Sequence, residues 1–136
     1  MQKIIITGSS GLIGSHILLE LSKEYHLHCL VRADSKRINK PNIEYFVMDF
    51  MNPTFEKSAF KDVFAVIHLL SVKHSYNPDI LAINVEFTKS LVEISKKNKI
   101  GKFIYMSSET VQLPGIDGYT RSKKLAEKEV NKYGNH

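Results

Sequence analysis

A glycine-rich turn close to the N-terminus constrains this chain more than any other feature of its sequence. Residues 3–14 read Lys-Ile-Ile-Ile-Thr-Gly-Ser-Ser-Gly-Leu-Ile-Gly, which places Gly8, Gly11 and Gly14 at equal intervals. The β-branched run predicts a buried strand, and the apolar positions after it predict a helix whose N-terminus is bare of side chains. Exposed N–H groups at the positive end of a helix dipole attract phosphate. We therefore expect a turn that holds the pyrophosphate of a dinucleotide.

The rest of the chain alternates between short apolar runs and amphipathic helical patterns. After the strand at 3–7, further strands are expected at 28–31, 43–48, 63–70 and 102–106. Helices are expected at 12–25, from Asn52-Pro53 to residue 60, at 80–98 and at 119–132, with loops at 71–79 and 109–118. This alternation predicts an α/β fold, a doubly wound, Rossmann-like parallel sheet of about five strands with helices on both faces. Right-handed crossovers give the strand order 3-2-1-4-5, with a crevice between strands 1 and 4 at their carboxyl ends.

The bulk composition is that of one globular domain, with 43% hydrophobic and 24% charged residues over 136 positions. The formal net charge of +5 comes from scattered lysines, and no nucleic-acid motif accompanies them, so no nucleic-acid partner is expected. The apolar runs are too short to span a bilayer, and the chain starts directly with a strand pattern, so no membrane partner is expected. The single cysteine, Cys29, predicts a buried, inert thiol in a reducing, cytoplasmic compartment.

The histidines and the glycine turn exclude two other classes of site at this stage. The six histidines show no metal-ligand spacing with cysteine or acidic partners, so no metal site is expected; they are His16, His26, His28, His68, His74 and His136. His68 lies in a continuous apolar strand and is interpreted as a packed side chain. No G-K-[ST] sequence follows the glycines, which argues against a P-loop nucleotidase or kinase.

Arg32 stands directly after the expected strand at 28–31, where folds of this kind face the adenine ribose. An acidic residue there accepts the ribose 2′-hydroxyl, whereas an arginine accommodates a 2′-phosphate. Ser35, Lys36 and Arg37 follow in the adjacent loop. The pattern favours NADP as the cofactor, with NAD as the second choice because Asp34 is close enough to take the acidic role.

Tyr119 and Lys123 form a Y-x-x-x-K pair on one face of the last expected helix. A lysine ammonium beside a phenol favours the phenolate, which suits a general acid or base. Ser107 and Ser108 end the preceding strand, and their combination with the tyrosine–lysine pair is far more specific than the pair alone.

In family order along the whole chain, these motifs resemble the extended, NAD(P)-dependent epimerase/dehydratase branch of the short-chain dehydrogenase/reductase superfamily. Residues 7–14 match its T-G-x-x-G-x-[IL]-G turn, and 66–70 are similar to its V-[IV]-H-x-A segment. Asp49 matches the acid that contacts the adenine amino group, and Asn84 with Val85 matches an asparagine–valine pair on the fourth helix. Residues 103–108 match the strand that carries the active-site serine.

The resemblance implies a residue-by-residue set of roles. Ser108 would orient the substrate oxygen in preference to Ser107, Tyr119 would exchange a proton with it, and Lys123 would lower the tyrosine pKa and hold the nicotinamide ribose. The implied cofactor contacts are Gly8, Ser10, Gly11, Leu12, Ile13, Gly14, Arg32, Asp49, Phe50, Leu69, Leu70, Asn84, Tyr119 and Lys123. The implied reaction is hydride and proton transfer at a carbinol or carbonyl carbon, of the oxidoreductase, epimerase or dehydratase kind.

Two departures from the family pattern qualify this interpretation. The segment between Ser108 and Tyr119 is shorter than in sugar-nucleotide members, and the sequence stops at His136, before the C-terminal substrate lobe of the family. The expectation is that residues 1–136 form an NAD(P)-binding domain alone, as an oligomer, a part of a longer protein or a truncated gene product. A homo-oligomer or partner would then cover the edge of the fifth strand. The alternative function is a cofactor-binding module without turnover, such as a redox sensor, an interaction protein or a truncated pseudoenzyme.

Overall fold

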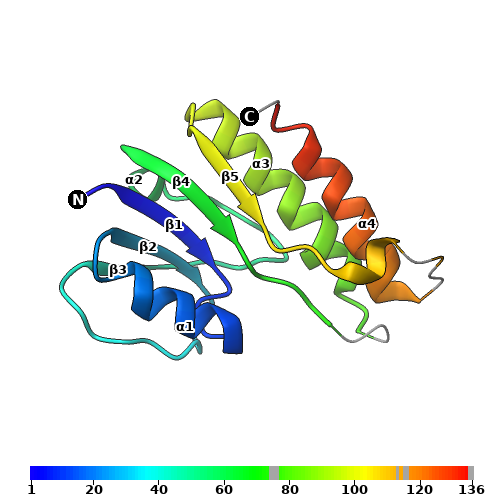
Figure 1. The fold of residues 1–136 in the computed structure, drawn as a ribbon, viewed down its shortest axis with the longest axis horizontal. Coiled ribbons are helices and arrows are strands. Elements are labelled where there is room, and N and C mark those ends of the chain that lie inside the picture. The colour runs from blue at the N-terminus through cyan, green and yellow to red at the C-terminus, as the bar shows by residue number, and fades with distance from the viewer. Residues whose placement is uncertain (74–76, 113, 115–116, 135–136) are drawn as a thin grey trace.

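The computed structural model describes residues 1–73, 77–112, 114 and 117–134. Its five strands form one parallel sheet in the order β3-β2-β1-β4-β5 (Figure 1), as the sequence predicted. The strands are β1 (Lys3–Thr7), β2 (His26–Val31), β3 (Ile43–Val47), β4 (Val63–His68) and β5 (Lys102–Tyr105). The strand order reverses between β1 and β4, so the crevice of the fold lies at the carboxyl ends of these two strands.

Helices cover both faces of this sheet, also as predicted. They are α1 (Leu12–Leu21), α2 (Lys57–Phe60), a π-helical segment η1 (Ala82–Phe87), α3 (Thr88–Lys97), a 3₁₀ turn η2 (Glu109–Gln112) and α4 (Gly118–Asn131). Alternate residues of β1 divide the core in two: Ile4 and Ile6 pack with Leu18 of α1, whereas Ile5 packs with Phe60 and Leu91 on the opposite face. Helices α3 and α4 lie side by side on that second face (Figure 1).

Several element boundaries differ from the sequence expectation. Helix α1 ends at Leu21 rather than near residue 25, because Asn42 Nδ2 donates to the carbonyls of Ser22 and Tyr25 at 2.5 and 2.9 Å. The predicted start of the second helix at Asn52-Pro53 is wrong: α2 begins at Lys57. The segment before it is extended, which allows the ring of Phe55 to pack on Phe60 and on the core.

The long helix expected at 80–98 is divided into η1 and α3. Its first part is π-helical over Ala82–Phe87, and the hydroxyl of Thr88 donates to the carbonyl of Asn84 at 2.9 Å. The expected loop at 109–118 contains the turn η2, although its residues 113, 115 and 116 lie outside the described part of the chain. The described residues of the 71–79 loop form no helix or strand, and residues 74–76 lie outside the description.

The sheet leaves an apolar strip uncovered along its β5 edge. Strand β5 pairs with β4 alone, and the side chain of Ile104 is 51% exposed, with Met106 beyond the strand at 41%. An exposed apolar edge of this kind is a site where natural proteins usually place a covering element. Within the described residues, no helix has the length and apolar character needed to cross a membrane.

Candidate functional site

The glycine turn between β1 and α1 is closely packed against the end of β4 and against itself. Gly8 has a φ of +74°, and a Cβ atom there would lie 2.8 Å from the backbone nitrogen of Leu70 after β4. A Cβ atom on Gly14 would overlap the carbonyl oxygen of Gly8. The first glycine therefore allows the turn to pass under the end of β4, and the third allows α1 to pack against the turn.

Gly11 serves a different purpose from its two neighbours. It is the N-cap residue of α1, it is exposed, and no side chain caps the helix. Leu12 and Ile13 in the first turn are also exposed, at 80% and 50%. Within the described part of the chain, no side-chain hydrogen bond caps this first turn, and the partial positive charge of the helix N-terminus suits a phosphate group.

A cavity of about 380 Å³ joins this turn to the residues predicted to carry the chemistry. From the predicted set it is lined by Gly8, Ser10, Gly11, Leu12, Ile13, Gly14, Leu69, Leu70, Ser108, Tyr119 and Lys123. Ser71, Lys73 and Met106 also line it and were not predicted. Their position directly after β4 and β5, at the carboxyl end of the sheet, was the signal available in the sequence.

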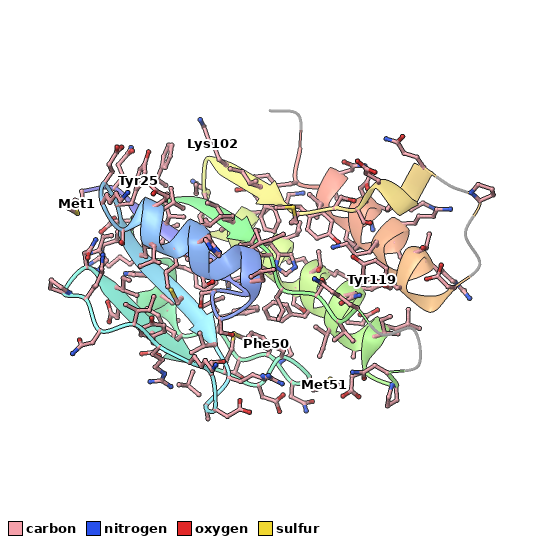
Figure 2. The ribbon with its side chains drawn as sticks, turned by 60° about the horizontal axis from the view of Figure 1, so that its bottom comes forward. Met1, Tyr25, Phe50, Met51, Lys102 and Tyr119 are labelled. Atoms are coloured by element: carbon pink, nitrogen blue, oxygen red, sulfur yellow. The ribbon has the colours of Figure 1, made fainter. Side chains whose placement is uncertain are left out.

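A second hollow of about 190 Å³ lies on the other side of Gly8, toward β2. Arg32, Ser35 and Phe50 contribute to its wall together with the backbone of the glycine turn. The Arg32 guanidinium lies 3.7 Å from the carboxylate of Asp34, and both side chains are mostly exposed. Arg32 therefore stands where a ribose or its phosphate would lie in this fold, with an acidic neighbour that competes for its charge. Phe50 lines the smaller hollow and Tyr119 the larger one; both side chains are labelled in Figure 2.

Lys123 is almost completely buried, with 2% of its surface exposed. Its Nζ donates to the carbonyl oxygen of Met106 at 2.7 Å and lies 4.4 Å from the ring centroid of Tyr105. Burial is the main cause that lowers the pKa of Lys123 to about 8; the carboxylate of Glu127 opposes this shift, and the positive charge of Lys73 contributes to it. The ammonium is thus held inside the site by a carbonyl group and an aromatic face.

Tyr119 is placed in the first turn of α4 by a local cap. The side chain of Asp117 accepts a hydrogen bond from the Thr120 amide at 2.9 Å, which fixes the start of the helix. One turn later the helix brings Lys123 to the same cavity as Tyr119. The hydroxyl of Ser107 donates to Glu127 at 2.7 Å, so of the two serines Ser107 already has a carboxylate partner.

His68 is fully buried and acts as a structural hydrogen-bonding group, as the sequence interpretation expected. The hydroxyl of Thr88 donates to Asn84, so it accepts from the Nε2–H of His68 at 2.7 Å. The Nδ1 atom then accepts from the hydroxyl of Thr7 at 2.6 Å. Burial first, and Lys123 second, lower the pKa of His68 to about 3, so the ring is neutral.

Two of the predicted cofactor contacts line neither hollow. Asn84 is buried, and its amide pairs with both backbone groups of Val72 at 2.6 and 2.8 Å and donates to Ser122 Oγ at 2.9 Å. Asp49 is exposed and its carboxylate accepts from the Met51 amide at 2.8 Å. Direct contact of either residue with a cofactor stays a prediction. Asn84 has a clear framework role, because it holds the chain after β4 against the start of α4.

Comparison with known proteins agrees with this geometry. The model of the NAD dependent epimerase/dehydratase family matches residues 4–135. The chain belongs to this family. Its cofactor turn, strand order and Y-x-x-x-K helix are therefore parts of an epimerase/dehydratase-type Rossmann domain.

Relatives in the family have several activities. The chain is 30% identical to a dTDP-D-glucose 4,6-dehydratase of Dictyostelium discoideum, a match that covers 85% of this chain and 31% of the relative. It is 26% identical to a decarboxylating sterol-4-alpha-carboxylate 3-dehydrogenase of Saccharomyces cerevisiae, over 97% of this chain and 46% of the relative. The chain thus spans less than half the length of these relatives.

Solved structures share the fold at lower identity. The UDP-glucuronic acid 4-epimerase of Bacillus cereus, determined in complex with NAD, superposes with a TM-score of 0.81 at 22% identity, covering 97% of this chain and 52% of that one. The terminal R domain of the myxalamid biosynthetic pathway gives a TM-score of 0.83 at 23% identity, covering 98% of this chain and 45% of that one. Both confirm the Rossmann-like α/β arrangement.

Proposed function

We propose that residues 1–136 bind a nicotinamide dinucleotide along the crevice and catalyse hydride and proton transfer at a carbinol or carbonyl carbon. The observation that carries this proposal is the 380 Å³ cavity, because it joins the uncapped N-terminus of α1 to Ser108, Tyr119 and Lys123. A pyrophosphate would lie at the first turn of α1, where the N-cap Gly11 carries no side chain and no side-chain cap is bonded to the helix start. The NAD named for several solved structures of the same fold supports a cofactor of this class.

For the adenosine half we propose NADP in preference to NAD. Arg32 follows β2 at the wall of the 190 Å³ hollow, and a guanidinium can contact a 2′-phosphate through two N–H groups. The carboxylate of Asp34 at 3.7 Å is the competing feature, since an acid favours the free 2′-hydroxyl of NAD.

The catalytic roles follow from the positions of three side chains. We assign Tyr119 as the group that exchanges the hydroxyl proton, and Lys123 as the buried cation that favours the tyrosinate. Ser108, which lines the cavity, would donate to the substrate oxygen, as the family resemblance implies. A nicotinamide held in the crevice would supply the hydride acceptor. In the oxidation of an alcohol, the Tyr119 tyrosinate would take the hydroxyl proton, and the electrons of the broken O–H bond would form the carbonyl as the hydride leaves the carbon.

Two measurements test the proposal. Binding of NADPH and NADH is followed by fluorescence titration, with Arg32→Ala as the variant; we expect tighter binding of NADPH and a loss of that preference in the variant. Equal affinities of the two cofactors for the wild type would refute the NADP assignment. Binding of neither cofactor would refute the function as a whole.

Turnover is tested against a panel of alcohols, ketones and nucleotide sugars. Tyr119→Phe and Ser108→Ala should abolish or strongly reduce activity, typically by a hundredfold or more for a lost proton-transfer group. Ser107→Ala is the matched control and should retain most of it. Cofactor binding without turnover on any panel member would favour the second candidate, a cofactor-binding module without turnover.

A further inference from the structure

Two histidines and a glutamate converge at the amino-terminal end of β2 and β3, away from the crevice. His26 and His28 are two residues apart on β2 and so lie on one face of the sheet. Glu44 is the direct neighbour of His28 on β3 in the parallel register. One ligand-type atom from each of the three residues lies within 4.8 Å of the others. The pair H-x-H on a strand was present in the sequence, but its acidic partner comes from the next strand and only the fold reveals it.

The hydrogen bonds of His28 define which of its nitrogen atoms faces this cluster. The side chain is 3% exposed, and its Nδ1 lies 2.7 Å from the carbonyl oxygen of Ala59. Because a carbonyl accepts only, Nδ1 carries the proton and donates it. In the neutral ring the Nε2 lone pair then faces the Glu44 carboxylate at 3.6 Å. Two acceptors thus face each other, an arrangement that a cation between them would stabilise.

The geometry suits a tetrahedral metal ion. Zn²⁺ binds imidazole nitrogen and carboxylate oxygen at about 2.0–2.2 Å, which places tetrahedral ligand atoms about 3.4 Å apart. Glu44 Oε2 lies 3.6 Å from His28 Nε2 and 4.0 Å from His26 Nε2, so small side-chain rotations suffice. The Ala59 carbonyl that orients His28 is the kind of outer partner that metal-binding histidines have.

We propose that His26, His28 and Glu44 form a zinc-type metal site, with three protein ligands and a fourth position open to solvent. Two positive groups oppose a cation there, the side chain of Lys3 and the α-amino group of Met1, both of which act electrostatically on His26. The carboxylate of Glu44 supplies one compensating charge. Because β3 is the edge strand and pairs with β2 alone, a bound ion would fasten that edge to the sheet.

This site is separate from the proposed cofactor site. The ligands lie at the start of β2 and near the start of β3, whereas the glycine turn and the Tyr119 cavity lie at the carboxyl ends of the strands. Metal binding is therefore expected to affect the stability of the β2–β3 edge and to leave cofactor affinity unchanged.

The test uses the tag-free, full chain after treatment with a chelator. We expect calorimetric titration with Zn²⁺ to show one equivalent bound, Co²⁺ to give the visible absorption of a tetrahedral complex, and Zn²⁺ to raise the unfolding temperature. Glu44→Gln and His26→Gln should each weaken Zn²⁺ binding by tenfold to a hundredfold. His28 is left unchanged because it is buried in the core.

The control is His16→Gln, which removes an exposed histidine of α1 that is no part of the cluster. It should bind Zn²⁺ as the wild type does. Equal losses in His16→Gln and in the two cluster variants, or no Co²⁺ spectrum and no stabilisation by Zn²⁺ in the wild type, would overturn the proposal. The three side chains would then be neighbours at the sheet edge that hold no metal ion.

Discussion

The pH dependence of folding stability tests the buried hydrogen-bond network around His68. The ring donates to Thr88 and accepts from Thr7, so both of its nitrogen atoms are satisfied only in the neutral form. Protonation at Nδ1 would remove an acceptor and place a charge in the core near Lys123. We expect the native state to resist protonation of His68 to well below the pH at which the unfolded chain takes up a proton.

The magnitude follows from the two pKa values. Burial is the main cause that lowers the native pKa of His68 from 6.5 to about 3. Between these values the unfolded state binds one more proton than the native state, so this contribution to stability is complete above pH 6.5 and decreases as the pH falls. The limiting slope is about 1.4 kcal/mol per pH unit, and the loss between pH 7 and pH 5 is about 2 kcal/mol. Total stabilities of small domains are about 5–15 kcal/mol, so this loss is readily measurable.

Urea unfolding followed by far-ultraviolet circular dichroism measures this loss, since the chain has no tryptophan. The wild type is compared with His68→Gln at several pH values from 7 to 5. The variant should be less stable at pH 7, but its stability should fall by about 2 kcal/mol less over the same range. Other groups titrate in both proteins, so the difference isolates His68. Parallel curves for the two proteins would refute a native histidine held neutral by its buried partners.

Three further outcomes are expected. Gly14→Ala should lower the free energy of unfolding by about 1–3 kcal/mol or more, because the added methyl group overpacks against Gly8. The control Gly101→Ala should change the free energy of unfolding little in the same urea assay, because its added Cβ would lie 3.7 Å from the carbonyl oxygen of Phe64. Lys123→Met should raise the unfolding temperature at neutral pH while activity falls, because burial lowers the native pKa of the lysine to about 8. Above that pH the native state binds fewer protons than the unfolded state, so the gain in unfolding temperature should shrink toward pH 10. An unchanged unfolding temperature would contradict this reasoning. Light scattering should show that copies of the chain associate through the uncovered β5 edge, and Ile104→Lys should reduce this association. A wild-type chain that stays monomeric at high concentration would contradict a self-associating edge.

Much of the fold could be predicted because its signals are local. The β-branched run at 3–7 and the three glycines define one strand, one turn and one helix within a dozen residues, and right-handed crossovers then determine the strand order. The errors occur where tertiary packing overrides local preference. Asn52-Pro53 is a sound helix-start signal, but the ring of Phe55 packs in the core from an extended segment, and the helix begins only at Lys57.

The candidate site divides in the same way. The glycine turn and the Tyr119–Lys123 spacing were visible in the sequence, whereas the partners of Lys123 were not, because the Met106 carbonyl and the Tyr105 ring come from another element. The π-helical geometry of η1 also escaped prediction, since i,i+5 hydrogen bonding leaves the apolar pattern nearly unchanged. Asn84 was predicted by resemblance alone, and its framework contacts with Val72 and Ser122 needed the fold.

These framework contacts connect the glycine turn to α4 through buried side chains. The oxygen of Thr7 accepts from the amides of Leu69 and Leu70, which fixes the chain that passes over Gly8. The network continues from Thr7 through His68 and Thr88 to the backbone carbonyl of Asn84.

From Asn84 the side-chain amide donates to Ser122, whose hydroxyl donates to the carbonyl of Tyr119. The distance between the glycine turn and Tyr119 is therefore set by satisfied hydrogen bonds inside the core, where unpaired polar groups would be costly. The proposed site is in this way preorganised by the Rossmann domain itself. Under the proposed function, residues that recognise a substrate would need to position only the carbon that exchanges the hydride.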